Sequence, residues 1–167
     1  MRRIAALTRS PMAVALVASL ALAGCASKQS VPNTAAEIGL DGAATPGSRQ
    51  EFTVKIGDRV FFDTDSSVIR ADAQATLARQ AQWLRQYPSY SITIEGHADE
   101  RGTREYNLAL GARRAAATRD FLVSQGVQAT RMKTISYGKE RPVAVCDDIS
   151  CWSQNRRAVT VLNGAGS

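Results

Sequence analysis

Residues 94–103 read Ile-Glu-Gly-His-Ala-Asp-Glu-Arg-Gly-Thr, and they join a predicted strand to a predicted helix. Apolar and polar residues alternate over positions 90–95, which is the period of a strand. On the other side, Thr103 is placed to cap a helix that runs to about Gln125, and Gly126 is placed to end it. The stretch is therefore a polar loop between two regular elements, and it leads directly into a helix N-terminus.

The rest of the chain supplies elements of the same two kinds. The patterns predict a strand at 60–62, a helix over about 73–84 that stops at Tyr87-Pro88, and strands at 132–137 and 158–162. The resulting order is β-α-β-α-β-β. Such alternation predicts an α+β two-layer fold, in which a small mixed four-stranded sheet carries its helices on one face.

The N-terminus has the pattern of an export signal. Three arginines precede an apolar run at 12–22, which is too short to span a bilayer because a spanning helix needs about 20 apolar residues. Residues 22–25, Leu-Ala-Gly-Cys, resemble the bacterial lipobox, in which the cysteine carries a lipid. The alternative is an ordinary signal cleaved near 21–23, which would leave Cys25 as a spare thiol. We expect residues 1–24 to be removed and Cys25 to be acylated.

Loss of the signal changes the charge balance. The whole chain has 21 Lys and Arg against 15 Asp and Glu. The signal contains three of the basic residues and no acidic one, so the mature chain has 18 against 15. A net charge of this size on an exported protein does not indicate a nucleic-acid partner.

Composition divides the mature chain into two parts. Residues 25–50 contain the lipidated cysteine and then many glycine, proline and small polar residues, with few large apolar ones. Such a segment cannot bury a core, so we expect a flexible tether. Residues 51–167 are long enough for one compact domain, and they contain all of the predicted strands and helices.

The loop at 94–103 and the helix after it contain the strongest candidates for a binding site. Asp99 supplies an anion near the helix entrance, where backbone N–H groups lack partners. Arg114 offers a fork of donors suited to a carboxylate, and Asn107 and Leu110 can share its side of the helix. The pattern fits a ligand that has both an amine and a carboxylate. It equally fits Asp99 as a helix-stabilising acid, with Arg114 as its ion-pair partner or as a surface charge.

Several longer motifs resemble one known family. They are residues 94–103, Tyr106-Asn107, Leu110-Gly111, Arg113-Arg114-Ala115, Phe61-Phe62-Asp63, Ser136–Pro142 and Asn155–Val159, taken together with the lipobox. In this order they look very like the peptidoglycan-associated lipoproteins. That family belongs to the wider group similar to the C-terminal domain of outer-membrane protein A.

The resemblance implies a lipoprotein held in the outer membrane, with a periplasm-facing domain that binds peptidoglycan without a covalent bond. Ala26, rather than aspartate, after the lipidated cysteine agrees with that location by analogy with the enterobacterial sorting rule. The implied ligand is the diaminopimelate of an uncross-linked stem peptide. No cofactor is implied beyond the lipid on Cys25.

The resemblance also implies a role for each residue of the site. Asp99 accepts the charged amine of the ligand, and Arg114 takes its carboxylate. The opposite wall and the helix side of the site are formed, partly through backbone groups, by Phe62, Asp63, Thr64, Asn107 and Leu110.

The implied partners are TolB and TolA of the Tol system. TolB would use much the same surface as the wall, so the two would compete. The protein would then be a switchable tether between outer membrane and wall that supports envelope integrity and constriction at division. Two alternatives stay open, namely a peptidoglycan-lytic enzyme and a pure protein adaptor of the Tol system.

An enzyme is not expected. The chain has no Gly-x-Ser-x-Gly elbow, and His97 lies only two residues from Asp99 on the same loop. A lone histidine there is more often a hydrogen-bonding loop residue than a general base. Asp63 and Asp65, spaced by one residue after a strand, are more typical of a turn than of a glycoside hydrolase.

Cys146 and Cys151 are not required by a domain of this type. Export favours a disulfide between them, which would close a short loop. The alternatives are two reduced thiols, or a metal site with His97. A metal site needs three or four ligands, and the chain has one histidine, so we expect no metal.

Overall fold

The computed structural model of the chain describes residues 44–164. The predicted signal peptide, Cys25 and the predicted tether up to residue 43 lie outside the described residues. Among the helices within 44–164, none is long and apolar enough to cross a membrane.

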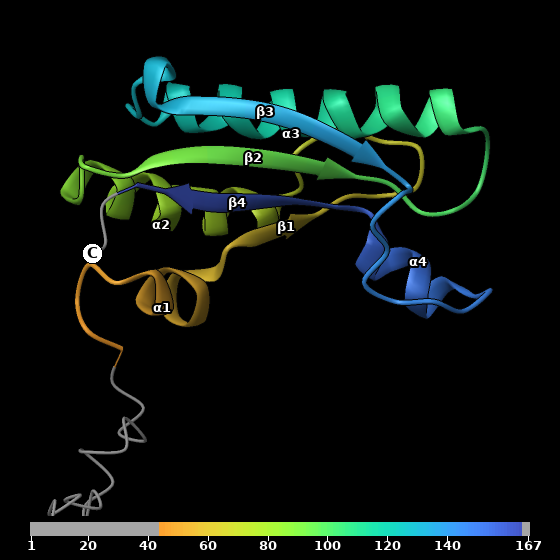
Figure 1. Ribbon diagram of the computed structural model, residues 1–167, viewed down its shortest axis with the longest axis horizontal. Coiled ribbons are helices and arrows are strands. Elements are labelled where there is room, and N and C mark those ends of the chain that lie inside the picture. Colours follow the sequence, from red (N-terminus) through yellow and green to blue (C-terminus); the bar gives the residue numbers. More distant parts are fainter. Residues whose placement is uncertain (1–43, 165–167) are drawn as a thin grey trace, which may run out of the picture. The chain divides into compact units, whose positions relative to one another are not determined.

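The elements follow one another in the predicted order, with four short additions (Figure 1). They are α1 (Arg49–Glu51), the π-helical turn η2 (Phe52–Gly57), β1 (Arg59–Phe61), α2 (Ala71–Gln86), β2 (Ser91–His97), α3 (Arg104–Ser124), the 3₁₀ turn η3 (Ala129–Arg131), β3 (Met132–Gly138), α4 (Ile149–Asn155) and β4 (Arg157–Asn163). The predicted β-α-β-α-β-β order is confirmed. The sequence patterns missed α1, η2, η3 and α4 because elements of at most seven residues are too short to show a helical period.

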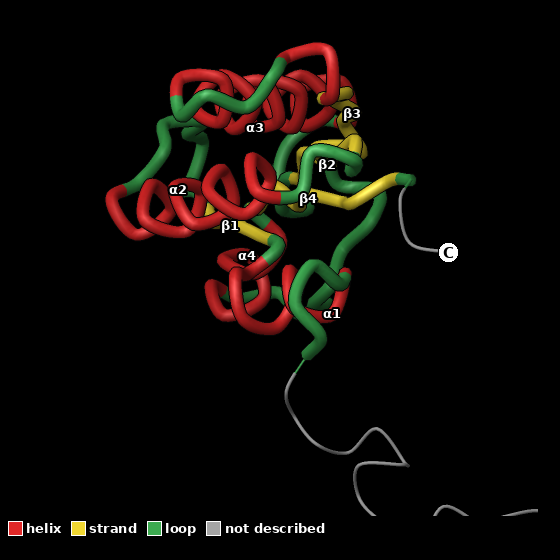
Figure 2. Tube along the Cα trace, turned by 90° about the vertical axis from the view of Figure 1, so that its left-hand side faces the viewer, coloured by secondary structure: helices red, strands yellow, loops and turns green. Residues whose placement is uncertain are grey.

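The four strands form one mixed sheet in the order β1-β4-β2-β3. β2 and β3 are parallel, and α3 provides the crossover that parallel neighbours need. β4 is antiparallel to both β1 and β2, so the last strand of the chain lies inside the sheet. Figure 2 shows the two long helices, α2 and α3, on the same side of the strands. The predicted α+β two-layer fold is therefore confirmed.

The core lies between the sheet and these two helices. Alternate strand residues such as Ile92, Ile94 and Leu162 point into it, and α2 adds Leu77 and Leu84, which are fully buried. The apolar stripe of α2 and the alternation along β2 and β4 are therefore two sides of one contact surface.

Two glycines bring α3 unusually close to β2. A Cβ atom on Gly96 would lie 1.8 Å from the carbonyl oxygen of Gly111, and a Cβ on Gly111 would lie 2.8 Å from the carbonyl oxygen of Gly96. Only residues without a side chain permit this spacing. The contact holds the N-terminal half of α3 against the end of β2, where the polar loop begins.

The domain begins earlier than the predicted boundary between residues 50 and 51. Ala44 is buried, and the Tyr90 hydroxyl donates to the Gly47 carbonyl at 2.9 Å. The Glu51 carboxylate accepts from the Gly47 N–H at 2.7 Å and from the Trp83 indole at 2.9 Å. The composition of residues 44–50 did not indicate that they belong to the domain, because they contact it through backbone hydrogen bonds and one small side chain, Ala44.

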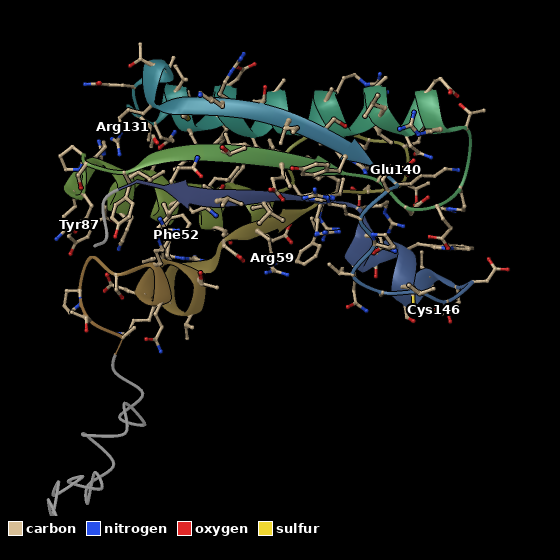
Figure 3. The ribbon with its side chains drawn as sticks, in the orientation of Figure 1. Phe52, Arg59, Tyr87, Arg131, Glu140 and Cys146 are labelled. Carbon is tan, nitrogen blue, oxygen red and sulfur yellow. A yellow bond between two sulfur atoms is a disulfide. The ribbon has the colours of Figure 1, made fainter. Side chains whose placement is uncertain are left out.

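An aromatic cluster closes the core at this end of the sheet. The rings of Phe52 and Tyr87 lie 4.9 Å and 4.6 Å from the Trp83 ring, and Figure 3 shows both labelled residues near the α1 end of the domain. Arg131 ties the same region together, because its guanidinium donates to the backbone carbonyls of Leu84, Tyr87 and Tyr90. The opposite end of the sheet contains the loop at residues 98–103.

Candidate functional site

A cavity of about 260 Å³ opens where the loop after β1 meets the loop between β2 and α3. Both loops leave the same end of the sheet, at the right in Figure 1. The cavity is lined by Thr64, Asp65, Asp99, Arg101, Gly102, Tyr106, Asn107, Leu110 and Arg114. The structure thus brings together two segments that lie about 35 residues apart in the sequence.

Most of the residues predicted for the site line this cavity. Those that do are Thr64, Asp99, Asn107, Leu110 and Arg114, whereas Phe62 and Asp63 do not. The sequence predicts no role for Arg101, Gly102 or Tyr106, and it predicts only a turn at Asp65. Their nearness to Asp99 and Asn107 along the chain was the only available signal, and it does not indicate where each side chain points.

Phe62 and Asp63 support the cavity from behind. The Phe62 side chain is buried in the core, with its ring centroid 5.2 Å from the Arg114 guanidinium carbon. Its N–H donates to the Arg156 carbonyl at 2.9 Å. The Asp63 carboxylate turns outward to pair with Arg70 at 3.1 Å, while its carbonyl accepts from Arg114. Both residues therefore hold Arg114 in place.

Asp99 is almost completely buried, and two arginines compensate its charge. Its carboxylate accepts from the Arg101 guanidinium at 2.7 and 3.1 Å and from the Arg156 guanidinium at 3.4 Å. Burial by itself would raise the pKa of Asp99, but the hydrogen bonds from Arg101 outweigh it and hold that pKa below its usual value. The acid is therefore ionised at neutral pH, and its nearest counter-ion belongs to the same loop.

Arg114 is fully buried, which is rare for a charged side chain. Its guanidinium donates to the carbonyls of Ser66, His97 and Asp63 at 2.8, 2.8 and 3.0 Å. Burial lowers the pKa of Arg114 to about 10, while the nearby Asp99 charge acts in the opposite direction. The side chain is still cationic at pH 7. Three of its five N–H groups donate to these carbonyls, so two have no acceptor among the described residues.

Local structure at the start of α3 shapes the floor of the cavity. The Thr103 hydroxyl caps the helix by accepting from the Tyr106 N–H at 3.2 Å, as predicted. The Asn107 amide donates to the Arg101 carbonyl at 2.6 Å and so fixes the loop that contains Asp99. Asn107 therefore acts on the loop, and Leu110, which is also buried, contributes apolar surface.

A hydrogen bond crosses the mouth of the cavity. The Tyr106 hydroxyl donates to the Asp65 carboxylate and joins α3 to the loop after β1. Asp65 has a φ of 53°, in the left-handed region that few residues other than glycine adopt. This contact sets how widely the two loops are separated.

His97 is not arranged as a general base. It is 1% exposed, and neither ring nitrogen has a hydrogen-bond partner among the described residues. Burial, with smaller effects from the charges of Arg157 and Arg141, lowers the pKa of His97 to about 4. The imidazole is therefore neutral at pH 7. The Glu95 carboxylate lies 3.6 Å from its Nε2, which is beyond hydrogen-bond distance, so this acid does not orient the ring for proton transfer.

Two solved structures have the same fold. The peptidoglycan-associated lipoprotein from Burkholderia pseudomallei is 47% identical, with a TM-score of 0.62 over 64% of this chain and 90% of that one. The C-terminal domain of Helicobacter pylori MotB is 24% identical, with a TM-score of 0.61 over 65% of this chain and 85% of that one. The second likeness is one of fold alone.

Comparisons of sequence give the same family. The OmpA family profile matches residues 61–156. The peptidoglycan-associated lipoprotein of Mesorhizobium japonicum is 79% identical over the full length of both chains, and that of Rhizobium meliloti is 76% identical over 99% of this chain and 94% of its own. The chain belongs to the OmpA family and, within it, to the peptidoglycan-associated lipoproteins.

Proposed function

We propose that the protein is an outer-membrane lipoprotein, anchored through Cys25, whose periplasmic domain binds peptidoglycan without a covalent bond and without catalysing a reaction. The observation that carries the proposal is a cavity with an ionised acid, Asp99, and a buried arginine, Arg114, on its lining. The names of the relatives agree, since they designate lipoproteins associated with peptidoglycan.

The ligand that fits this pair is diaminopimelate with a free amine, as in an uncross-linked stem peptide. Its ammonium would approach Asp99, and its carboxylate would receive the two remaining N–H groups of Arg114. Thr64 would contribute from the opposite wall, and Leu110 would shape the cavity. Phe62 and Asp63 would act through Arg114, whose position they fix.

Binding would require Arg101 to move. Its guanidinium nitrogen lies 2.7 Å from a carboxylate oxygen of Asp99, in the position that a ligand ammonium would take. Arg101 is 40% exposed and lies 4.1 Å from the centre of the Trp152 ring, so it can leave the acid and stay partly held on the indole. A ligand ammonium would therefore replace the Arg101–Asp99 ion pair with its own ion pair to Asp99. This exchange favours ligands that also present a carboxylate to Arg114.

The family resemblance supports a role in the Tol system, with TolB and TolA as protein partners. In that role the protein links the outer membrane to the wall, and competition between TolB and peptidoglycan makes the link reversible. Envelope integrity and constriction at division would both depend on it.

Co-sedimentation with purified peptidoglycan sacculi tests wall binding. The mature chain should pellet, and Asp99→Asn and Arg114→Lys should each stay largely in solution, because a lost charge-assisted hydrogen bond is worth about 1.5–3 kcal/mol. Asp120→Asn and Arg113→Lys are matched controls on exposed positions of α3 and should pellet like the parent. Failure of the parent chain to pellet would refute the proposal, and loss of sacculus material would indicate a lytic enzyme instead.

A further inference from the structure

A second arginine, Arg156, is almost completely buried beside the site. It directly follows α4 and is 7% exposed. Its guanidinium donates through Nε to the Phe62 carbonyl at 3.1 Å and through Nη1 to the Asp99 carboxylate at 3.4 Å. Its Nη2 has no acceptor among the described residues, and it is not one of the enclosed side-chain atoms that lack a partner. Arg156 therefore keeps two N–H groups that a ligand can reach.

Arg156 lines a cavity of about 280 Å³, which we call the Arg156 cavity. It lies between the end of β1, the start of α2 and α4, and α4 is at the same end of the sheet as the loop at residues 98–103 (Figure 1). The Phe61 ring, which is 38% exposed, gives the cavity an apolar wall, and Gln154 lines it from α4. An aromatic wall keeps water away from a charged donor and so strengthens the hydrogen bonds of that donor.

The charges around the Arg156 cavity leave one cation only partly compensated. Arg70 and Asp72 also line the cavity, but Arg70 is paired with both Asp63 and Asp72, at 3.1 and 3.0 Å. Arg156 instead shares the single charge of Asp99 with another arginine, which lies closer to that acid, at 2.7 Å against 3.4 Å. A planar guanidinium with spare N–H groups matches the geometry of a carboxylate. The cavity is therefore suited to a ligand carboxylate.

The wall that carries Arg156 is ordered before any ligand binds. Cys151, on α4, is joined by a disulfide to Cys146, with the two Cα atoms 5.7 Å apart, and the labelled Cys146 lies on the loop before α4 in Figure 3. The buried Asn155 side chain accepts from two backbone N–H groups of the same loop, at 2.8 and 3.2 Å. A donor held in place in this way loses little entropy when it binds.

The Arg156 guanidinium lies between the two cavities, because it lines one and contacts Asp99, which lines the other. Ligand groups bonded to Asp99 and to Nη2 of Arg156 would be on the order of 10 Å apart at most, and two or three residues of an extended peptide span this distance. A stem peptide has a suitable group, since the glutamate that precedes diaminopimelate is linked through its side chain and keeps its α-carboxylate.

We propose that the Arg156 cavity binds this glutamate α-carboxylate, as a second anionic group of the same stem peptide. The inference rests on the proposed function, in which the diaminopimelate ammonium approaches Asp99 and its carboxylate approaches Arg114. The wall peptide would then be held at three charged points, and Arg156 would contact both the ligand and Asp99.

Calorimetry of the mature chain tests the proposal with two stem tripeptides that end in diaminopimelate. One has a free glutamate α-carboxylate and the other has that group as an amide, and the amide should bind about 10-fold more weakly. Gln154→Glu adds a negative charge to the lining and should weaken binding of the free acid about fivefold, whereas Asp72→Asn removes one and should strengthen it about threefold. Both variants should bind the amide within about twofold of the parent.

Matched controls make the same chemical changes elsewhere. Gln128→Glu, before η3, and Asp120→Asn, near the end of α3, alter exposed residues, and both elements end far from α4 in Figure 1. Asp120 pairs with Arg119 much as Asp72 pairs with Arg70. Neither control should change the affinity for either peptide.

Three results would overturn the proposal. Equal binding of the two peptides by the parent chain would reject the second carboxylate and leave the proposed function intact. A preference for the free acid that neither Gln154→Glu nor Asp72→Asn changes would place that carboxylate outside the Arg156 cavity. Binding of neither peptide would refute the proposed function and this inference with it.

Discussion

Lowering the pH from 7 to 4.5 should destabilise the domain through one buried side chain, His97. The imidazole is 1% exposed, it has no hydrogen-bond partner among the described residues, and the charges of Arg157 and Arg141 act on it. Protonation would therefore place a third cation in a buried site near Arg157 and Arg141, and only the Glu95 carboxylate, 3.6 Å from Nε2, would offset part of its cost. In the unfolded chain the same side chain is free in water and protonates readily.

The structure gives the sign and the size of the effect. The pKa of His97 is about 4 in the folded protein, whereas that of an unperturbed histidine side chain is 6.5. As the pH falls, the unfolded state therefore takes up the proton first. The stabilisation is complete above pH 6.5 and is lost as the pH falls from 6.5 towards 4. Between pH 7 and pH 4.5 the free energy of unfolding should fall by about 2 kcal/mol from this group, at 1.36 kcal/mol per pKa unit.

Urea unfolding at several pH values measures this loss. His97→Gln should remove it, so the parent and variant curves should converge as the pH falls, while titration of the carboxylates affects both proteins alike. The chain has one histidine, so a single imidazole resonance reports its pKa by NMR. A pKa of 6 or above, or parallel pH profiles for the two proteins, would refute the reasoning.

Three further changes have defined outcomes. Gly111→Ala should lower the free energy of unfolding in urea by about 1–3 kcal/mol, because the added Cβ would clash with the backbone of Gly96. If the variant were instead stabilised by about 1 kcal/mol, as the higher helix propensity of alanine alone would predict, the close packing would be contradicted. Reducing the Cys146–Cys151 disulfide should lower the free energy of unfolding by about 2 kcal/mol, and an unchanged urea midpoint under reductant would contradict this. Arg101→Gln should strengthen binding of a diaminopimelate peptide in calorimetry, since Asp99 would keep only its longer ion pair, to Arg156 at 3.4 Å. Weaker binding would mean that Arg101 contacts the ligand.

Much of the fold could be predicted because its main elements repeat a pattern locally. The alternation along 90–95 and the helical spacing over 73–84 each reflect contact with one core, so each is visible within a short window. The strand order could not be predicted in this way. Pairing of Ile94 with Thr160 joins residues far apart in the sequence, and nothing local to either one specifies the other.

The site was predicted in part for a similar reason. The residue pattern placed Asp99 and Arg114 at one strand end and on the next helix, but it fitted a binding site and a structural role equally, and the family resemblance favoured the binding site. The sequence could not indicate that Arg101 turns back onto Asp99, since a loop side chain has no periodic direction. Nor could it indicate that the Phe62 side chain would face the core rather than the cavity, because an aromatic residue at a strand end suits either environment.

Direct binding of small peptides tests the central claim, that the cavity recognises an amine and a carboxylate together. Calorimetry of the mature chain would compare a stem tripeptide ending in diaminopimelate with one ending in lysine and with one whose free side-chain amine is acetylated. Each altered peptide lacks one charged group, so each should bind about 10- to 100-fold more weakly, as expected for a lost charge-assisted hydrogen bond. Equal affinity for all three peptides would contradict the account.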